Sequence, residues 1–129
     1  MNFETLFAGV NDNPVEAALI GVGEFGASLI AQGQRMPSLK VRVLCDQDTA
    51  RAQSAAIAAG VDAEAICICD NGKDSKAAFE KGLTVILQDA ALINDLAVDI
   101  VVEATGVPEV AARNALAAIE HGRHVAMVS

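Results

Sequence analysis

Short apolar runs alternate with segments of helical periodicity along most of this chain. The runs at 15–20, 40–46, 83–89, 98–106 and 123–129 have the composition of strands, and 24–34, 48–60, 74–82, 90–97 and 108–122 have helical patterns. Strands that alternate with helices form a parallel sheet, because right-handed crossovers wind the helices onto its faces. The sequence therefore predicts an α/β fold, doubly wound, with a mainly parallel sheet of about five or six strands and helices on both faces.

Two segments are less regular. Residues 65–70, AICICD, fit either a short strand or an apolar loop, and residues 2–9 place Phe3, Leu6 and Phe7 on one face of a short amphipathic helix. Asp48 or Thr49 is the expected cap of the helix after the second strand, and Asp74 is the expected cap of the helix at 74–82.

Three glycines mark the first strand-to-helix junction. The stretch GVGEFG, from Gly21 to Gly26, follows a predicted strand directly and opens a predicted helix, and Asp46 stands at the end of the next strand. A glycine triplet alone is a weak signal, but this combination of strand, turn, helix and acidic residue is the fingerprint of a Rossmann-type dinucleotide site.

Each part of the fingerprint has a physical role. Gly21 allows the tight turn, Gly23 leaves room for a pyrophosphate against the backbone, and Gly26 lets the helix pack closely on the strand. The helix N-terminus offers unpaired N–H groups and a partial positive charge to the phosphates. Asp46 would accept hydrogen bonds from the adenosine ribose.

The glycines allow two other interpretations. In one, they serve packing alone and Asp46 is a surface cap, which requires several coincidences. In the other, they form a phosphate loop of the nucleoside-triphosphatase type, but that loop needs a Lys followed by Ser or Thr, and Ala27 and Ser28 follow Gly26.

A second constellation ends the strand at 98–106. Its last residues, Glu-Ala-Thr-Gly, place Ala104, Thr105 and Gly106 at the carboxyl edge of the sheet, where ligands bind in such folds. We expect Thr105 and Gly106 near the nicotinamide half of a cofactor. Glu103 is the one ionisable residue within this apolar strand, and we expect it to contact the cofactor or a loop rather than to act as a base.

Composition excludes several classes of partner. The net charge of −8, with no Lys or Arg run, argues against nucleic acid and charged membrane surfaces. Only four Phe and no Tyr or Trp are present, so base stacking is also disfavoured. No signal peptide or membrane-spanning run is evident, and an odd cysteine count favours a reducing cytoplasm.

The cysteines and histidines give no metal or catalytic site. Cys45 is expected in the core, and the side chains of Cys67 and Cys69 are expected on opposite faces of a strand, too poorly placed for a disulfide. Their spacing also differs from that of a zinc knuckle. His121 and His124 are expected to be structural. We therefore assign no catalytic residue and no metal ligand.

The motifs GVGEFG and VVEATGVPEVAARNALAAIEHGRHVAMVS together resemble the N-terminal dinucleotide-binding domain of homoserine dehydrogenase and its relatives. MPSLKVRVLCDQDTARA is similar to the second-strand region of those proteins. MNFETLF and the segment from Cys67 to Ile86 resemble a branch that includes deoxyxylulose phosphate reductoisomerase-like enzymes, whose C-terminal parts are SAF-like.

The resemblance implies a role for particular residues. It implies that Gly21, Gly23, Glu24, Phe25 and Gly26 contact the diphosphate, that Asp46 lies at the adenosine ribose, and that Ala104, Thr105 and Gly106 lie near the nicotinamide. In homoserine dehydrogenases the catalytic and substrate-binding residues follow the fifth strand, where this chain stops. Residues 1–129 are thus expected to be one dinucleotide-binding domain of a larger two-domain enzyme, which would supply the small-molecule substrate site.

The cofactor and the class of protein stay open on the sequence alone. Asp46 would repel a ribose phosphate and favours NAD, whereas the reductoisomerase-like relatives use NADP, with which Arg51 could pair. The chain is expected to bind NAD or NADP for hydride transfer in an oxidoreductase and to be inactive by itself. A stand-alone regulatory module without catalysis, or a structural domain without cofactor, is the alternative. An exposed last strand would invite self-association into a homo-oligomer.

Overall fold

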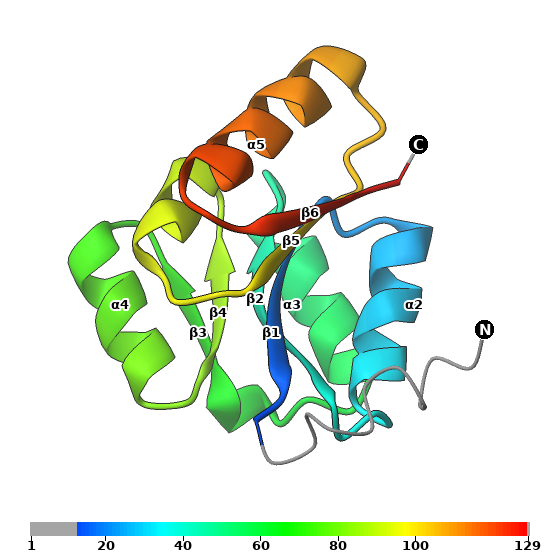
Figure 1. The fold of residues 1–129 in the computed structure, drawn as a ribbon. Helices are drawn as coiled ribbons and strands as arrows, with labels where there is room; N and C mark the ends of the chain where they lie inside the picture. The colour runs from blue at the N-terminus through cyan, green and yellow to red at the C-terminus, as the bar shows by residue number, and fades with distance from the viewer. Residues whose placement is uncertain (1–12, 129) are drawn as a thin grey trace.

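One parallel sheet forms the centre of the molecule. The computed structural model describes residues 13–128, so the helix expected at 2–9 lies outside the described residues. The strands of this part are β1 (Val15–Ile20), β2 (Leu39–Cys45), β3 (Ile66–Cys69), β4 (Thr84–Leu87), β5 (Ile100–Glu103) and β6 (His124–Met127). They form a six-stranded sheet in the order β3-β4-β2-β1-β5-β6, and every pairing is parallel (Figure 1). The predicted α/β, doubly wound fold is confirmed.

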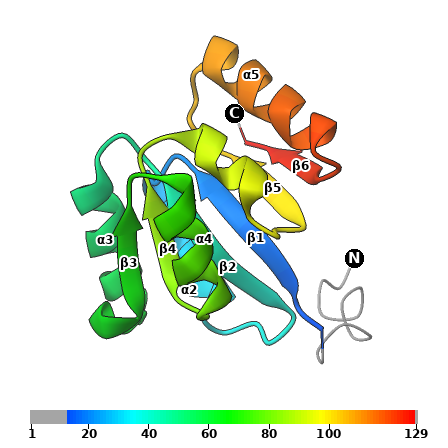
Figure 2. The same ribbon diagram turned by 90° about the vertical axis from the view of Figure 1, so that its left-hand side faces the viewer.

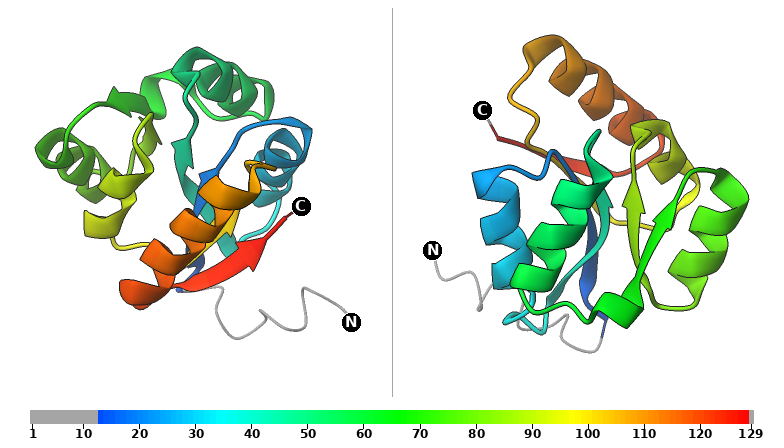
Figure 3. Two further views of the ribbon diagram at one scale, coloured as in Figure 1. Left: turned by 90° about the horizontal axis from the view of Figure 1, so that it is seen from above. Right: turned by 180° about the vertical axis from the view of Figure 1, so that it is seen from behind.

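Helices cover both faces of the sheet. The helical elements are α2 (Glu24–Gly33), α3 (Thr49–Ala58), α4 (Gly72–Glu80), α5 (Pro108–Glu120) and two 3₁₀ segments, η2 (Ala63–Ala65) and η3 (Ala90–Asp95). The helix α4 lies in front of the sheet in Figure 2, and α2 and α3 lie in front of it in the right panel of Figure 3. Residues of α4, η3 and α5 share one apolar core, and residues of α2 and α3 share the other.

The central strands are buried on both sides, which explains their continuous apolar sequence. Leu19, Leu44 and Ile86 point into the core beneath α2 and α3. Their chain neighbours on the same strands, such as Ala18 and Val43, point into the core beneath α4, η3 and α5. Because successive side chains of a strand alternate between faces, one short strand supplies both cores.

Several element boundaries differ from the sequence prediction. The segment 65–70 is a strand, β3, at the edge of the sheet, and the helix expected at 90–97 is the 3₁₀ segment η3. The expectation of Asp74 as a cap was wrong: α4 begins earlier, and the side chain of Asn71 accepts a hydrogen bond from the Asp74 N–H. Asp48 is the cap of α3, where its side chain accepts from the Arg51 N–H.

The expectation that Cys67 and Cys69 face opposite sides of their strand was wrong. Their Sγ atoms lie 3.5 Å apart. Residues separated by one position on a strand point to the same face, so the spacing brings the two side chains together. All three cysteines are nevertheless free.

The strand order creates a crevice between β1 and β5. These strands are neighbours, but the chain leaves β1 for α2 on one face and leaves β5 for α5 on the other. In open α/β sheets the gap between two such diverging connections, at the carboxyl ends of the strands, is where ligands bind. Within residues 13–128, no helix has the length and apolar character needed to cross a membrane.

Candidate functional site

Gly21 is the residue at which the chain turns out of β1. Its φ is +93°, a conformation that side-chain-bearing residues rarely adopt. A Cβ here would lie 2.7 Å from the carbonyl carbon and oxygen of Ala104, in the loop after β5. Gly21 therefore lets the β1–α2 and β5–α5 loops touch at the bottom of the crevice.

Gly26 brings the first helix close to the same turn. A Cβ at this position would lie 2.7 Å from the Gly21 carbonyl oxygen and 3.1 Å from Cδ2 of Leu19. This geometry agrees with the packing role expected from the sequence.

Gly23 differs from Gly21 and Gly26, because a Cβ built on it meets no atom of residues 13–128 within 4 Å. The space beside its backbone is open, so packing does not account for a glycine here. Gly23 is also the N-cap of α2, and within the described part of the chain this helix start has no side-chain cap hydrogen bond. The first four N–H groups of a helix have no partner within it. Open space beside uncapped N–H groups is the arrangement that a diphosphate requires.

Glu24 and Phe25 occupy the first turn of α2, and both side chains are exposed. Their N–H groups belong to the helix N-terminus, and it is through these groups that the two residues would meet a diphosphate.

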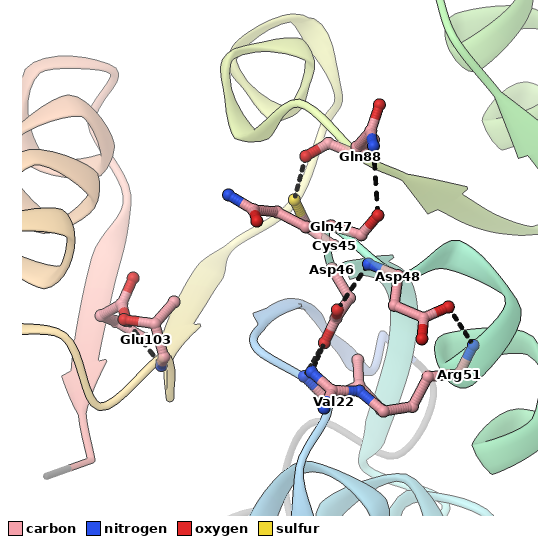
Figure 4. A network of polar contacts seen from close by, with 9 residues as sticks. Val22, Cys45, Asp46, Gln47, Asp48, Arg51, Gln88 and Glu103 are labelled. Atoms are coloured by element: carbon pink, nitrogen blue, oxygen red, sulfur yellow. Dashed lines mark hydrogen bonds and ion pairs between the residues drawn. The ribbon is translucent and has the colours of Figure 1, made fainter.

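Asp46 follows β2 directly and is buried. Figure 4 shows its carboxylate beside Val22 and Asp48. One carboxylate oxygen accepts from the Val22 N–H at 2.8 Å and from Nη2 of Arg51 at 2.7 Å, and the other accepts from the Asp48 N–H at 2.8 Å. A carboxylate has about four acceptor positions, so about one remains for a ligand. Asp46 thus fixes the glycine loop through Val22 and retains some capacity toward a ribose.

These contacts lower the pKa of Asp46. Burial alone would raise it, but the hydrogen bonds from Arg51 and from the backbone of Val22 and Asp48 outweigh burial. Because the folded-state pKa lies below the unfolded value of about 3.9, the stabilisation is present above that pH and is lost as the pH falls through the folded value.

We therefore expect Asp46→Asn to lower the free energy of unfolding at pH 7 by about 1–3 kcal/mol, the cost of weakening hydrogen bonds to a buried charge. The difference between the wild type and this variant should shrink below about pH 4. Urea unfolding of both proteins at several pH values measures it. A difference that stays constant down to about pH 2.5 would show that ionisation of Asp46 adds nothing to the free energy of unfolding.

The loop after β5 contains the second group of predicted residues. Ala104 contacts Gly21 as described, Gly106 has a φ of +73°, and Thr105 lines the crevice. The carboxylate of Glu103 is completely buried and accepts hydrogen bonds from Thr105 and from Asn114 of α5. Glu103 therefore contacts a loop, one of the two roles expected for it.

A cleft of about 580 Å³ opens at the carboxyl ends of β1, β2, β4 and β5, between η3 and α5. Of the predicted residues, Gly21, Asp46 and Thr105 line it, and the other six do not. Sequence reasoning missed several lining residues: Gln47, Gln88, Asp89, Asn94, Arg113 and Asn114. The position of Gln88 and Asp89 directly after β4 was the available signal, because every loop at this edge of a parallel sheet faces the same crevice.

One cysteine lines the cleft, and the two histidines line a separate hollow. Cys45 lines the cleft, and burial, with help from Asp46, Asp89 and Glu103, raises the pKa of its thiol to about 12. His121 and His124 line a separate hollow beside the amino ends of β1 and β5. Among residues 13–128 no three His, Cys, Asp or Glu side chains are grouped to hold a metal ion.

The parallel sheet, with the glycine turn beside the crevice between β1 and β5, defines a Rossmann-type nucleotide-binding domain. Residues 21–129 match the family model described as "Homoserine dehydrogenase, NAD binding domain". The chain belongs to this family, as its motifs predicted. The comparison with curated proteins gives no match.

Two solved structures illustrate the similarity of fold. One is scyllo-inositol dehydrogenase from Lactobacillus casei with bound NAD(H) and scyllo-inositol, at 17% identity and a TM-score of 0.55. The similarity covers 89% of this chain and 28% of that enzyme. The other is GenD2 from gentamicin A biosynthesis in complex with NAD, at 19% identity, a TM-score of 0.48, and coverage of 88% and 34%. The present chain therefore spans about a third or less of either protein.

Proposed function

We propose that this domain binds NAD or NADP for hydride transfer in an oxidoreductase of the homoserine dehydrogenase or reductoisomerase type. The observation that carries the proposal is Gly23, whose open side adjoins the uncapped N-terminus of α2. The family of NAD-binding domains to which the chain belongs supports the same conclusion.

The residues present fit such a cofactor. The N–H groups at the start of α2, including those of Glu24, Phe25 and Gly26, would hold the diphosphate, and the helix dipole would favour its negative charge. Asp46 would hold the adenosine ribose, and Ala104, Thr105 and Gly106 would lie along the nicotinamide half. When bound, the nicotinamide supplies the hydride chemistry, and this chain supplies orientation.

The substrate-binding and catalytic residues would belong to a second domain. This part of the proposal is supported by the small share, 28%, of the similar scyllo-inositol dehydrogenase structure that the chain spans. We further infer a reducing, cytoplasmic setting, which the three free cysteines support. Within residues 13–128 the edge strand β6 pairs with β5 alone, so its other edge is the candidate surface for self-association.

Calorimetric titration of the chain with NADH and with NADPH tests the proposal directly. Saturable binding of at least one of them is expected. Heat of dilution alone with both would refute cofactor binding and leave a structural domain, whereas binding without activity in the full-length protein would favour a regulatory module.

Asp46 and Arg51 form the pair that would distinguish the two cofactors. Asp46 would repel a ribose phosphate, and the guanidinium of Arg51, which is 57% exposed, would attract one. We expect Asp46→Ala to weaken both cofactors, because the Val22 contact is lost, but to weaken NADH more. Arg51→Ala should weaken NADPH by about three- to tenfold and change NADH little. Equal losses for both cofactors in both variants would exclude this pair as the basis of selectivity.

A further inference from the structure

Glu103 is a buried charged residue that the proposed function leaves unused. It ends β5 after the apolar residues Ile100–Val102, and its exposed fraction is 0%. Burying a carboxylate is costly unless hydrogen bonds compensate it. Val or Leu would pack at this position without that cost, so the contacts of Glu103 must account for a carboxylate here.

Donors approach both oxygens of this carboxylate. Oε1 accepts from the Thr105 N–H at 2.8 Å and from the Thr105 hydroxyl at 2.5 Å. Oε2 accepts from Nδ2 of Asn114 at 2.6 Å. The carboxylate thus joins the end of β5, the loop that follows it and the middle of α5.

This arrangement determines the direction of the Thr105 hydroxyl. The Thr105 hydroxyl donates to Oε1 of Glu103, so its hydrogen points at this carboxylate oxygen. One lone pair of the same oxygen faces the Val107 N–H at 3.3 Å. A hydroxyl oxygen has two lone pairs, so one acceptor position remains, on a residue that lines the cleft.

We propose that Glu103 is a positioning residue that fixes the Thr105 hydroxyl as a hydrogen-bond acceptor, so that this point of the cleft selects a ligand donor group. The inference rests on the proposed function. Two donors of the nicotinamide half have the required chemistry: a hydroxyl of its ribose and the N–H of its carboxamide.

Three ligands separate these donors and test the inference on the 129-residue chain. ADP has neither donor, ADP-ribose has the ribose hydroxyls, and NADH has both. We expect Thr105→Val to leave the Kd of ADP unchanged and to raise that of NADH about five- to tenfold, the effect of one hydrogen bond. Thr105→Ser, which keeps the hydroxyl, should retain wild-type affinity. A parallel loss with ADP-ribose identifies the ribose hydroxyl, and a loss with NADH alone identifies the carboxamide.

Two variants of Glu103 test its positioning role. Glu103→Gln keeps a carbonyl oxygen for Thr105, and the Asn114 amide can turn to accept from the new amide, so near wild-type affinity is expected. Glu103→Leu removes the acceptor and should reproduce the ligand pattern of Thr105→Val. The two effects should not add in the double variant, because they disable one interaction.

Several outcomes would overturn the inference. They are an unchanged NADH affinity in Thr105→Val, equal losses for ADP and NADH, or equal losses in Glu103→Gln and Glu103→Leu. Thermal unfolding monitors the fold, and if Glu103→Leu does not fold, the Gln, Val and Ser variants still decide the question. A wild-type chain that binds none of the three ligands refutes the proposed function itself, which distinguishes the two failures.

Discussion

Gly23→Val is expected to abolish dinucleotide binding while the domain stays folded. A Cβ on Gly23 meets no atom within 4 Å, so the valine side chain would project into the open space beside the N-terminus of α2. That space is where the diphosphate must approach the backbone. We expect the Kd for NADH or NADPH to rise by about a hundredfold or more, equivalent to about 2.7 kcal/mol.

The fold should tolerate this substitution because φ at Gly23 is −94°, outside the left-handed region. Calorimetric titration measures the loss of binding, and thermal unfolding of the same sample measures stability. Unchanged affinity in a folded Gly23→Val protein would show that no phosphate lies against this glycine. A lower melting temperature by more than a few degrees would show instead that Gly23 serves packing.

The sequence was sufficient to predict the class of fold and the first crossover, for identifiable reasons. The central strands are apolar throughout because both of their faces are buried, and Leu19 and Ala18 show this alternation within one strand. The glycine spacing encodes close contacts within one short segment, such as the 2.7 Å approach that a Cβ of Gly26 would make to the Gly21 carbonyl oxygen.

The side-chain contacts that the sequence did not predict join distant segments. The approach of Asp46 to the Val22 N–H joins residues 24 positions apart, and that of Asn114 to Glu103 joins residues 11 apart. No local pattern specifies such pairs. The error on Cys67 and Cys69 was of another kind, because the periodicity of two in a strand was sufficient to place both side chains on one face.

Gly21→Ala should have the opposite phenotype to Gly23→Val, with a large loss of stability. Two costs combine at Gly21: a φ of +93° and a Cβ that would lie 2.7 Å from the backbone carbonyl of Ala104. Strain at such a φ costs about 1–3 kcal/mol, and overpacking costs about as much again. We expect the free energy of unfolding in urea to fall by about 2–6 kcal/mol.

Gly82→Ala is the matched control for backbone strain alone. Gly82 has a φ of +83°, and a Cβ there meets nothing within 4 Å. The difference in unfolding free energy between the two alanine variants therefore isolates the collision with Ala104, which is the contact that joins the two loops of the crevice. If both variants lose the same free energy of unfolding, a Cβ at Gly21 does not collide with Ala104. The two loops, and with them the crevice between β1 and β5, would then be further apart than the 2.7 Å approach indicates. A larger loss for Gly21→Ala means that the turn at Gly21 packs tightly against Ala104, and so holds the loop that carries Thr105 in place. The diphosphate half and the nicotinamide half of the proposed cofactor site would then both depend on this one contact.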